Sequence, residues 1–163
     1  MTSRIATLLV VAACGGDTGA PEPPRDRADA GMQPGTVDDP DAGVSEKTIC
    51  DEAKTHSDFA WIQQHVLTPS CATAMCHAGP EPEVGLDLSA GPAYNNLVNK
   101  GASTVTGWTR VVPGSITQSY LAVSLGRAEG PPPRDGYMPL GADPLCVEKL
   151  EAIERWILAG AQP

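Results

Sequence analysis

Apolar positions recur at helical spacing in several stretches of the chain, and glycine- and proline-rich segments separate these stretches. The first stretch spans residues 57–67, where the apolar positions fall at i, i+3 and i+7 and form one face of a helix. These positions are Phe59, Ile62 and Val66. Ser57 or Asp58 can cap the start of this helix, and Pro69 is expected to end it.

The remaining periodic stretches lie in the second half of the chain. Short helices are predicted at 92–98 and 118–125. A longer closing helix is predicted with Asp143 as N-cap, Pro144 at its first position and Gly160 at its C-terminal end. Its buried stripe would comprise Leu145, Leu150, Ile153 and Ile157. No segment alternates convincingly as a strand, so the pattern predicts a small all-α domain with long loops.

The N-terminus carries a different signal. Residues 5–13 form an apolar run after a single arginine, which is too short to span a bilayer and typical of a signal peptide over residues 1–13. The run ends in Ala12-Ala13-Cys14 and resembles the lipobox of bacterial lipoproteins, in which the cysteine is acylated. We expect lipidation at Cys14 and an anchor in a bacterial cell envelope. An apolar run that ends in this way by chance is the alternative.

Residues 14–47 have the composition of a disordered tether. Over residues 15–47 acidic residues outnumber basic ones by eight to three, and aromatic residues are absent. All seven aromatic residues of the chain lie after residue 58. The folded domain is therefore expected at 48–163.

The charge and the motifs of the chain exclude several classes of function. The formal net charge is −9, which argues against nucleic acids and anionic lipid headgroups as partners. Phosphate-binding loops, nucleophile elbows and the paired histidines of zinc proteases are absent from the sequence. We therefore expect no enzyme activity.

Cysteine chemistry is concentrated at Cys71-Ala-Thr-Ala-Met-Cys76-His77. Two cysteines followed directly by a histidine are what covalent attachment of a c-type haem requires, with the imidazole as proximal ligand of the iron. The usual spacing has two residues between the cysteines, and this chain has four. A simple Cys71–Cys76 disulfide is one alternative. A zinc site is another, with a fourth ligand from His56 or His65.

Met138 is the methionine best placed to serve as the second axial ligand. It precedes a proline in a polar, glycine-rich loop rather than lying on an apolar stripe. A thioether in this position raises the reduction potential and closes the iron to oxygen. His65 or His56 is the competing distal ligand.

The remaining cysteines suggest a disulfide. If Cys14 is lipidated and Cys71 and Cys76 hold haem, Cys50 and Cys146 remain, and exported proteins rarely keep free thiols. We therefore expect a Cys50–Cys146 disulfide that ties the start of the domain to its last helix. Without haem, three pairings of the four domain cysteines are possible.

With these residues in view, the chain resembles the mono-haem c-type cytochrome domains of bacterial lipoproteins over residues 58–161. Beside the Cys/His/Met set, the matching segments are Gly85-Leu86-Asp87-Leu88-Ser89, Tyr94 with Leu97-Val98, Val111-Val112-Pro113-Gly114, Ser119-Tyr120-Leu121 and 153–161. The resemblance implies a cytochrome c-like fold in which the first and last helices cross beside the haem. It also implies one-electron transfer as the activity.

Together these observations predict a monomeric, lipid-anchored electron carrier with one covalent haem c. The acidic surface would suit a redox partner that presents a basic docking patch. The alternative is that the domain has lost haem and serves as a disulfide-stapled interaction module of a surface lipoprotein.

Overall fold

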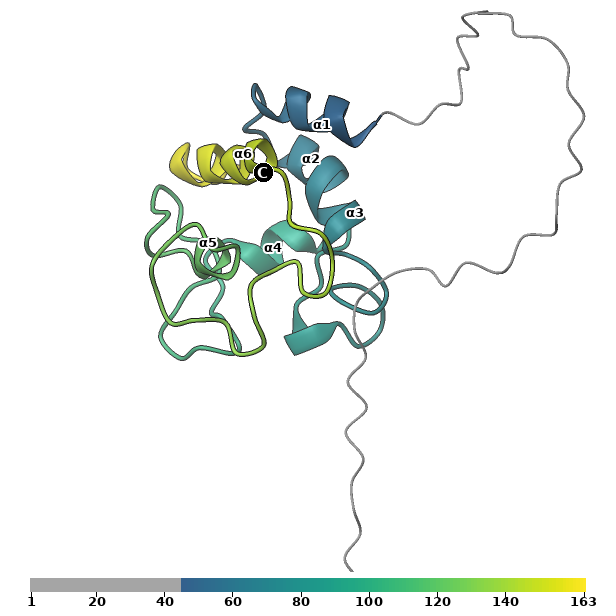
Figure 1. Cartoon of the computed structure of the whole chain (residues 1–163). Helices are drawn as coiled ribbons and strands as arrows, with labels where there is room; N and C mark the ends of the chain where they lie inside the picture. The colour runs from purple at the N-terminus through teal and green to yellow at the C-terminus, as the bar shows by residue number, and fades with distance from the viewer. Residues whose placement is uncertain (1–44) are drawn as a thin grey trace, which may run out of the picture.

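The computed structural model of the chain describes residues 45–163, which form a helical domain with long loops (Figure 1). The expected signal peptide, Cys14 and residues 14–44 of the expected tether lie outside the described residues. The described elements are α1 (Glu46–Ala53), α2 (Phe59–Ile62), η1 (Gln63–Leu67, a π-helical turn), α3 (Thr68–Ser70), η2 (Glu83–Gly85, a 3-10 turn), α4 (Ala93–Leu97), α5 (Tyr120–Ser124) and α6 (Val147–Leu158). Over these residues there are isolated β-bridges and no strand, which confirms the predicted helical class.

The first predicted helix is present and extends further than expected. Asp58 caps it, because its Oδ1 accepts the backbone N–H of Trp61 at 2.8 Å. The helical path then runs from α2 through η1 into α3 and ends only at Ser70. Pro69 lies inside α3 and has no backbone N–H to donate, so the helix continues past it with one hydrogen bond missing. The helix therefore delivers Cys71 directly at its C-terminal end.

The core lies between α2–η1, α4 and α6. Trp156 of α6 is 2% exposed, and its ring contacts Phe59 of α2 with centroids 5.1 Å apart. The indole Nε1 donates to the carbonyl of Gln162 at 2.7 Å, which satisfies the polar atom of this buried ring. Ile153 and Ile157 extend the same buried face, as the helical stripe predicts.

The start of α6 differs from the prediction. The helix begins at Val147 with Cys146 as N-cap, so Asp143 and Pro144 lie outside it. Cys146 is tied to α1 by a disulfide, and residues 141–143 and 145 line a cavity instead of continuing the helix. The predicted C-terminal end is correct to one residue, because Gly160 adopts φ +96° directly after the cap residue Ala159.

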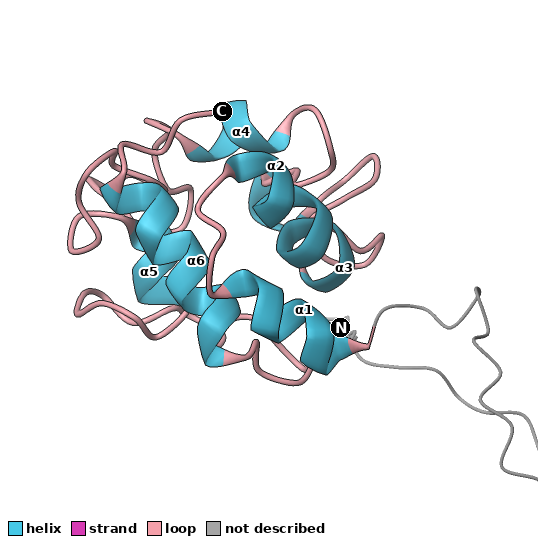
Figure 2. Ribbon diagram, turned by 90° about the horizontal axis from the view of Figure 1, so that it is seen from above, coloured by secondary structure: helices cyan, strands magenta, loops and turns pink. Residues whose placement is uncertain are grey.

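Helix α1 was not predicted, and it begins two residues before the expected domain boundary at 48. Ser45 caps it by accepting the backbone N–H of Thr48. Figures 1 and 2 show α1 beside α6, and the two helices pack against each other. The Arg155 side chain of α6 donates to the carbonyl of Ala53, the last residue of α1, and to that of His56 in the loop that follows.

The predicted helices at 92–98 and 118–125 appear as α4 and α5, each somewhat shorter than expected. Short bridges connect the loops around them, among them Val98 to Val111 and Thr109 to Ser119. Within residues 45–163 no helix combines the length and the apolar character that crossing a membrane would require.

Candidate functional site

A cavity of about 1580 Å³ opens between the end of α3, the loop that follows it, α5 and the loop that leads into α6. Cys71, Cys76, His77 and Met138 all line it. Ligand pockets are usually about 300–1000 Å³, so this one has room for a ligand as large as a porphyrin. The apolar wall includes Val66, Leu67, Leu86, Leu88, Leu97, Tyr120, Leu121, Leu125, Leu145 and Ile153.

Cys71 stands at the end of the first helical segment. Its backbone N–H donates to the carbonyl of Leu67 at 3.0 Å. The side chain carries a free thiol, and burial raises the pKa of this thiol to about 11. The thiol is therefore neutral at physiological pH, and the alternative of a Cys71–Cys76 disulfide is not what the structure contains.

The residues between the two cysteines form a compact turn. The backbone N–H of Cys76 donates to the carbonyl of Thr73 at 2.9 Å, and that of His77 returns to the carbonyl of Cys71 at 3.1 Å. The carbonyl of Cys76 in turn accepts the N–H of Glu83 at 2.7 Å. Four intervening residues therefore fit within a closed loop that keeps both cysteines and His77 on the same cavity.

His77 is held in the form that a metal ligand needs. Its Nδ1 lies 3.2 Å from the carbonyl oxygen of Leu86, and this acceptor makes Nδ1 the protonated nitrogen. Nε2 is then the nitrogen that carries the lone pair; the imidazole also interacts with the backbone of Glu83. Burial lowers the pKa of His77, which favours the neutral imidazole at pH 7.

The segment 85–89 positions the carbonyl that holds His77. Asp87 Oδ1 accepts the backbone N–H and the hydroxyl of Ser89 at 2.9 and 2.6 Å, which closes a tight turn. The side chain of Asn96 on α4 donates to the carbonyl of Asp87 at 2.8 Å. Leu88, which is 3% exposed, packs into the core. These contacts attach Leu86 firmly to α4.

Met138 reaches the cavity from the other long loop. Its backbone N–H donates to the carbonyl of Ser124 at 2.8 Å, which fastens the loop to the end of α5. The side chain is half-buried and lines the cavity, 61 residues after His77 in the sequence.

Two arginines, Arg110 and Arg134, also line this cavity. The Arg110 guanidinium donates from Nη1 to the carbonyl of Asn96 and from Nη2 to the hydroxyl of Ser103, both at 2.9 Å. Because these two bonds fix its plane, Arg110 can offer an oriented positive charge to an anionic ligand.

The competing distal ligands lie elsewhere. The ring of His56 stacks on Trp61 with centroids 4.7 Å apart, and His65 contacts the same indole at 4.9 Å. Neither histidine lines the cavity. The predicted zinc alternative also finds no support in the described residues, where the cluster of possible metal ligands is Glu46, Cys50 and Cys146.

The predicted disulfide is present, since Cys50 and Cys146 are bonded with their Cα atoms 6.3 Å apart. Beside it lies a charged pair that sequence reasoning missed. Lys149, only 2% exposed, places Nζ 2.7 Å from Glu46 Oε1. Lys149 could not be foreseen as buried, because its burial depends on a helix, α1, that was not predicted.

The residue types that line the cavity are those that a c-type haem would need. The cavity offers two cysteine positions, a neutral imidazole whose Nδ1 carries the proton, a thioether, an apolar wall and an oriented guanidinium. Comparisons with protein-family models, with curated proteins and with solved structures gave no match to this chain.

Proposed function

We propose that this domain holds one covalent haem c in the cavity and carries single electrons. Cys71 and Cys76 would supply the thioethers, His77 Nε2 the proximal ligand and Met138 Sδ the distal ligand. The haem would supply the redox chemistry through its iron, and the protein would bind it, orient it and exclude water. The observation that carries the proposal is the shared cavity, because residues 71–77 and residue 138 come together only through the fold.

His77 supports the proposal through its second nitrogen. Metal-bound histidines commonly donate their other N–H to a carbonyl or carboxylate, which fixes the tautomer and the orientation of the ring. The carbonyl of Leu86 provides that acceptor at 3.2 Å. A histidine that only covered the surface would not need such a fixed partner, nor a segment fastened to α4 to present it.

The state of the two sulfurs sets a condition for attachment. Thioether formation requires thiols; Cys71 is a thiol in this structure and Cys76 is disulfide-bonded. The proposal therefore places haem attachment on the reduced chain. Arg110, at the cavity, would pair with a haem propionate.

The partner and the location follow as parts of the same proposal. With a net charge of −9 the domain would favour a redox partner that presents a basic patch, in a weak and salt-sensitive encounter. Lipidation at Cys14, outside the described residues, would hold the protein in a bacterial cell envelope. The domain would act as an electron carrier and not as an enzyme.

The test is a pyridine haemochrome spectrum together with the intact mass of the full chain, produced in a host that has a c-type maturation apparatus. We expect one haem mass per chain and the spectrum of two saturated thioethers. Cys71→Ser and Cys76→Ser should each leave at most one thioether and shift the spectrum. The matched control is His65→Ala, which removes a histidine that does not line the cavity and should leave haem content unchanged.

A colourless protein without added mass would overturn the proposal. It would favour the haem-free, disulfide-stapled module instead, for which the Cys50–Cys146 disulfide is the supporting observation. If His77→Ala retained the same axial spectrum as the unchanged chain, the ligand assignment would be wrong even with haem attached.

A further inference from the structure

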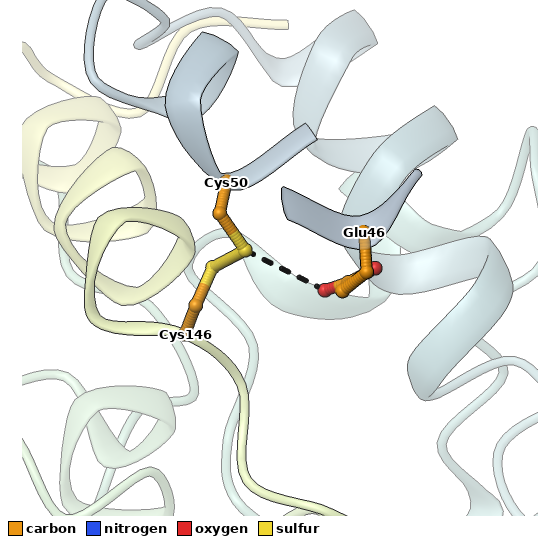
Figure 3. A group of neighbouring side chains, drawn as sticks. All are labelled: Glu46, Cys50 and Cys146. Atoms are coloured by element: carbon orange, nitrogen blue, oxygen red, sulfur yellow. Dashed lines mark hydrogen bonds between the residues drawn. A yellow bond between two sulfur atoms is a disulfide. The ribbon is translucent and has the colours of Figure 1, made fainter. Parts of the chain in front are cut away.

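Three potential ligand atoms, none of them from a residue assigned to haem, meet where α1 packs on the start of α6. Glu46 and Cys50 are four residues apart on α1 and therefore share one face of that helix. Figure 3 shows their side chains converging on Cys146, the N-cap of α6. The carboxylate oxygen and the two sulfurs all lie within 4.8 Å of one another, and Glu46 Oε1 is 3.6 Å from Cys50 Sγ.

Lys149 gives this cluster an unusual charge environment. The side chain is 2% exposed, whereas that of Glu46 is 67% exposed, and their ion pair measures 2.7 Å. A buried ammonium is costly unless a negative charge faces it. Glu46 supplies one such charge through Oε1, and any further negative charge that develops beside it would also face Lys149.

Helices α1 and α6 are held together by more than the disulfide. Arg155 binds the carbonyls of Ala53 and His56 at the far end of α1, and Ala53 itself is fully buried. The Lys149–Glu46 pair joins the near end. Because these contacts do not depend on the sulfur–sulfur bond, the two sulfurs should stay close together after the bond is broken.

We propose that the dithiol form of this cluster is a zinc site, with Cys50 and Cys146 as thiolate ligands and Glu46 as a carboxylate ligand. A dithiol reductant would first convert the disulfide to two thiols and itself become a disulfide. Zn²⁺ would then displace both thiol protons and bind the two sulfurs and one carboxylate oxygen, with water in the fourth position.

Ligand type and charge both suit this ion. Two thiolates and one carboxylate carry three negative charges, Zn²⁺ carries two positive charges, and the Lys149 ammonium brings the total to zero. Sulfur and carboxylate donors in a four-coordinate set favour Zn²⁺ over Mg²⁺ or Ca²⁺. Cys50 and Cys146 are partly exposed and the carboxylate is exposed, which leaves room for the bound water.

The test uses the full chain, reduced with a phosphine and titrated with Co²⁺ as a spectroscopic probe of the zinc site. We expect thiolate-to-cobalt charge-transfer bands and tetrahedral d–d bands that saturate at one Co²⁺ per chain and disappear when Zn²⁺ is added. The oxidised chain should show neither. In peptide maps, Zn²⁺ should protect Cys50 and Cys146 of the reduced chain from iodoacetamide.

The variants separate this site from the other thiols of the chain. Glu46→Gln should weaken Co²⁺ binding by roughly 10–100-fold. Glu52→Gln is the matched control, since it removes an exposed carboxylate of the same helix that is not part of the cluster, and it should leave affinity unchanged. Lys149→Met should also weaken binding, because it removes the balancing charge.

Two results would overturn the proposal. One is a reduced chain that retains its far-UV circular dichroism but shows no charge-transfer band with Co²⁺. The other is a Cys50→Ser/Cys146→Ser chain that binds Co²⁺ as tightly as the reduced parent. Neither result tests the haem proposal, because haem attachment involves Cys71 and Cys76 and is measured by intact mass and the haemochrome spectrum.

Discussion

The orientation of the His77 ring depends on a backbone carbonyl nine residues away. Its Nδ1 faces the carbonyl of Leu86, and Leu86 is fixed because the Asp87–Ser89 turn is fastened to Asn96 of α4. Burial lowers the pKa of the imidazole, so the ring is kept neutral as well as oriented. The residues around His77 therefore set both the tautomer and the protonation state of its imidazole.

The Cys71 thiol should show its raised pKa in its reactivity. In the haem-free chain, alkylation by iodoacetamide should be slow at pH 8 and should keep rising toward pH 11, whereas the rate for an exposed thiol levels off above its ordinary pKa of 9.0. The rate is measured by peptide mass mapping of Cys71 across this pH range. A rate that levels off near pH 9 would contradict the burial of the thiol.

The same shift predicts how stability depends on pH. Because the folded pKa lies above the unfolded one, the contribution of this thiol is fully present below pH 9 and is lost as the pH rises through about 11. The shift of two pKa units corresponds to at most about 3 kcal/mol of the free energy of unfolding. Urea midpoints of the haem-free chain and of Cys71→Ala between pH 8 and 11 should therefore converge as the pH rises.

Met138→Ala should lower the reduction potential of the haem-loaded protein and change its axial-ligand spectrum. A thioether stabilises the reduced iron more than the water or weaker ligand that would replace it. Potentiometry measures the shift. Met75→Ala is the control, since it removes the same group from the turn between the two cysteines. An unchanged potential in Met138→Ala would remove Met138 from the ligand set.

At the scale of the element, α1 depends on its neighbours. An isolated helix of eight residues is unstable in water, because it forms too few hydrogen bonds to offset the free-energy cost of nucleation. Its stability must come from α6, through Arg155 and Lys149 and through the buried Ala53. This also explains why periodicity predicted the long helix α6 and missed α1, which is only eight residues long and has few apolar positions, Ile49, Cys50 and Ala53.

Arg155→Ala should destabilise the end of α1. The guanidinium donates to two backbone carbonyls, and bonds from a charged donor contribute about 1.5–3 kcal/mol each before solvent exposure is considered. Hydrogen exchange of the α1 amides should accelerate, with a smaller drop in global stability. Arg134→Ala is the control, because Arg134 is 87% exposed and pairs only with Asp135 at 3.7 Å. Equal protection of α1 in both variants would contradict this role.

The four predicted helical segments show where periodicity succeeds and where it fails. The cores of α4 and α5 lie within the predicted ranges, because their apolar spacing is a local property. The predicted start of α6 was wrong, because the helix begins at Val147 although Asp143 and Pro144 are residue types that favour helix initiation. There the disulfide at Cys146 and the position of residues 141–143 and 145 on the cavity wall override the local preference.

At the scale of the whole molecule, one covalent bond links the two ends of the domain. Cys50 and Cys146 are 96 residues apart, and a loop of that length contributes about 4–5 kcal/mol in the chain-entropy model. The double variant Cys50→Ala/Cys146→Ala should lower the urea midpoint accordingly. Because α1 keeps its other contacts, the variant should still fold. An unchanged midpoint would show that the disulfide adds nothing to stability.

The sequence by itself determined the helical class and the residue types present at Cys71, Cys76 and His77, and it predicted the pairing of Cys50 with Cys146 on the condition that the other cysteines are otherwise engaged. These follow from local spacing, from residue type and from counting cysteines, none of which requires knowledge of the path of the chain. Only the tertiary structure decided that Met138 lines the same cavity as His77, that Leu86 supplies the acceptor for Nδ1 and that Lys149 is buried against Glu46. The reason is physical: each of these depends on where long loops return to the helices, and packing between distant residues settles that.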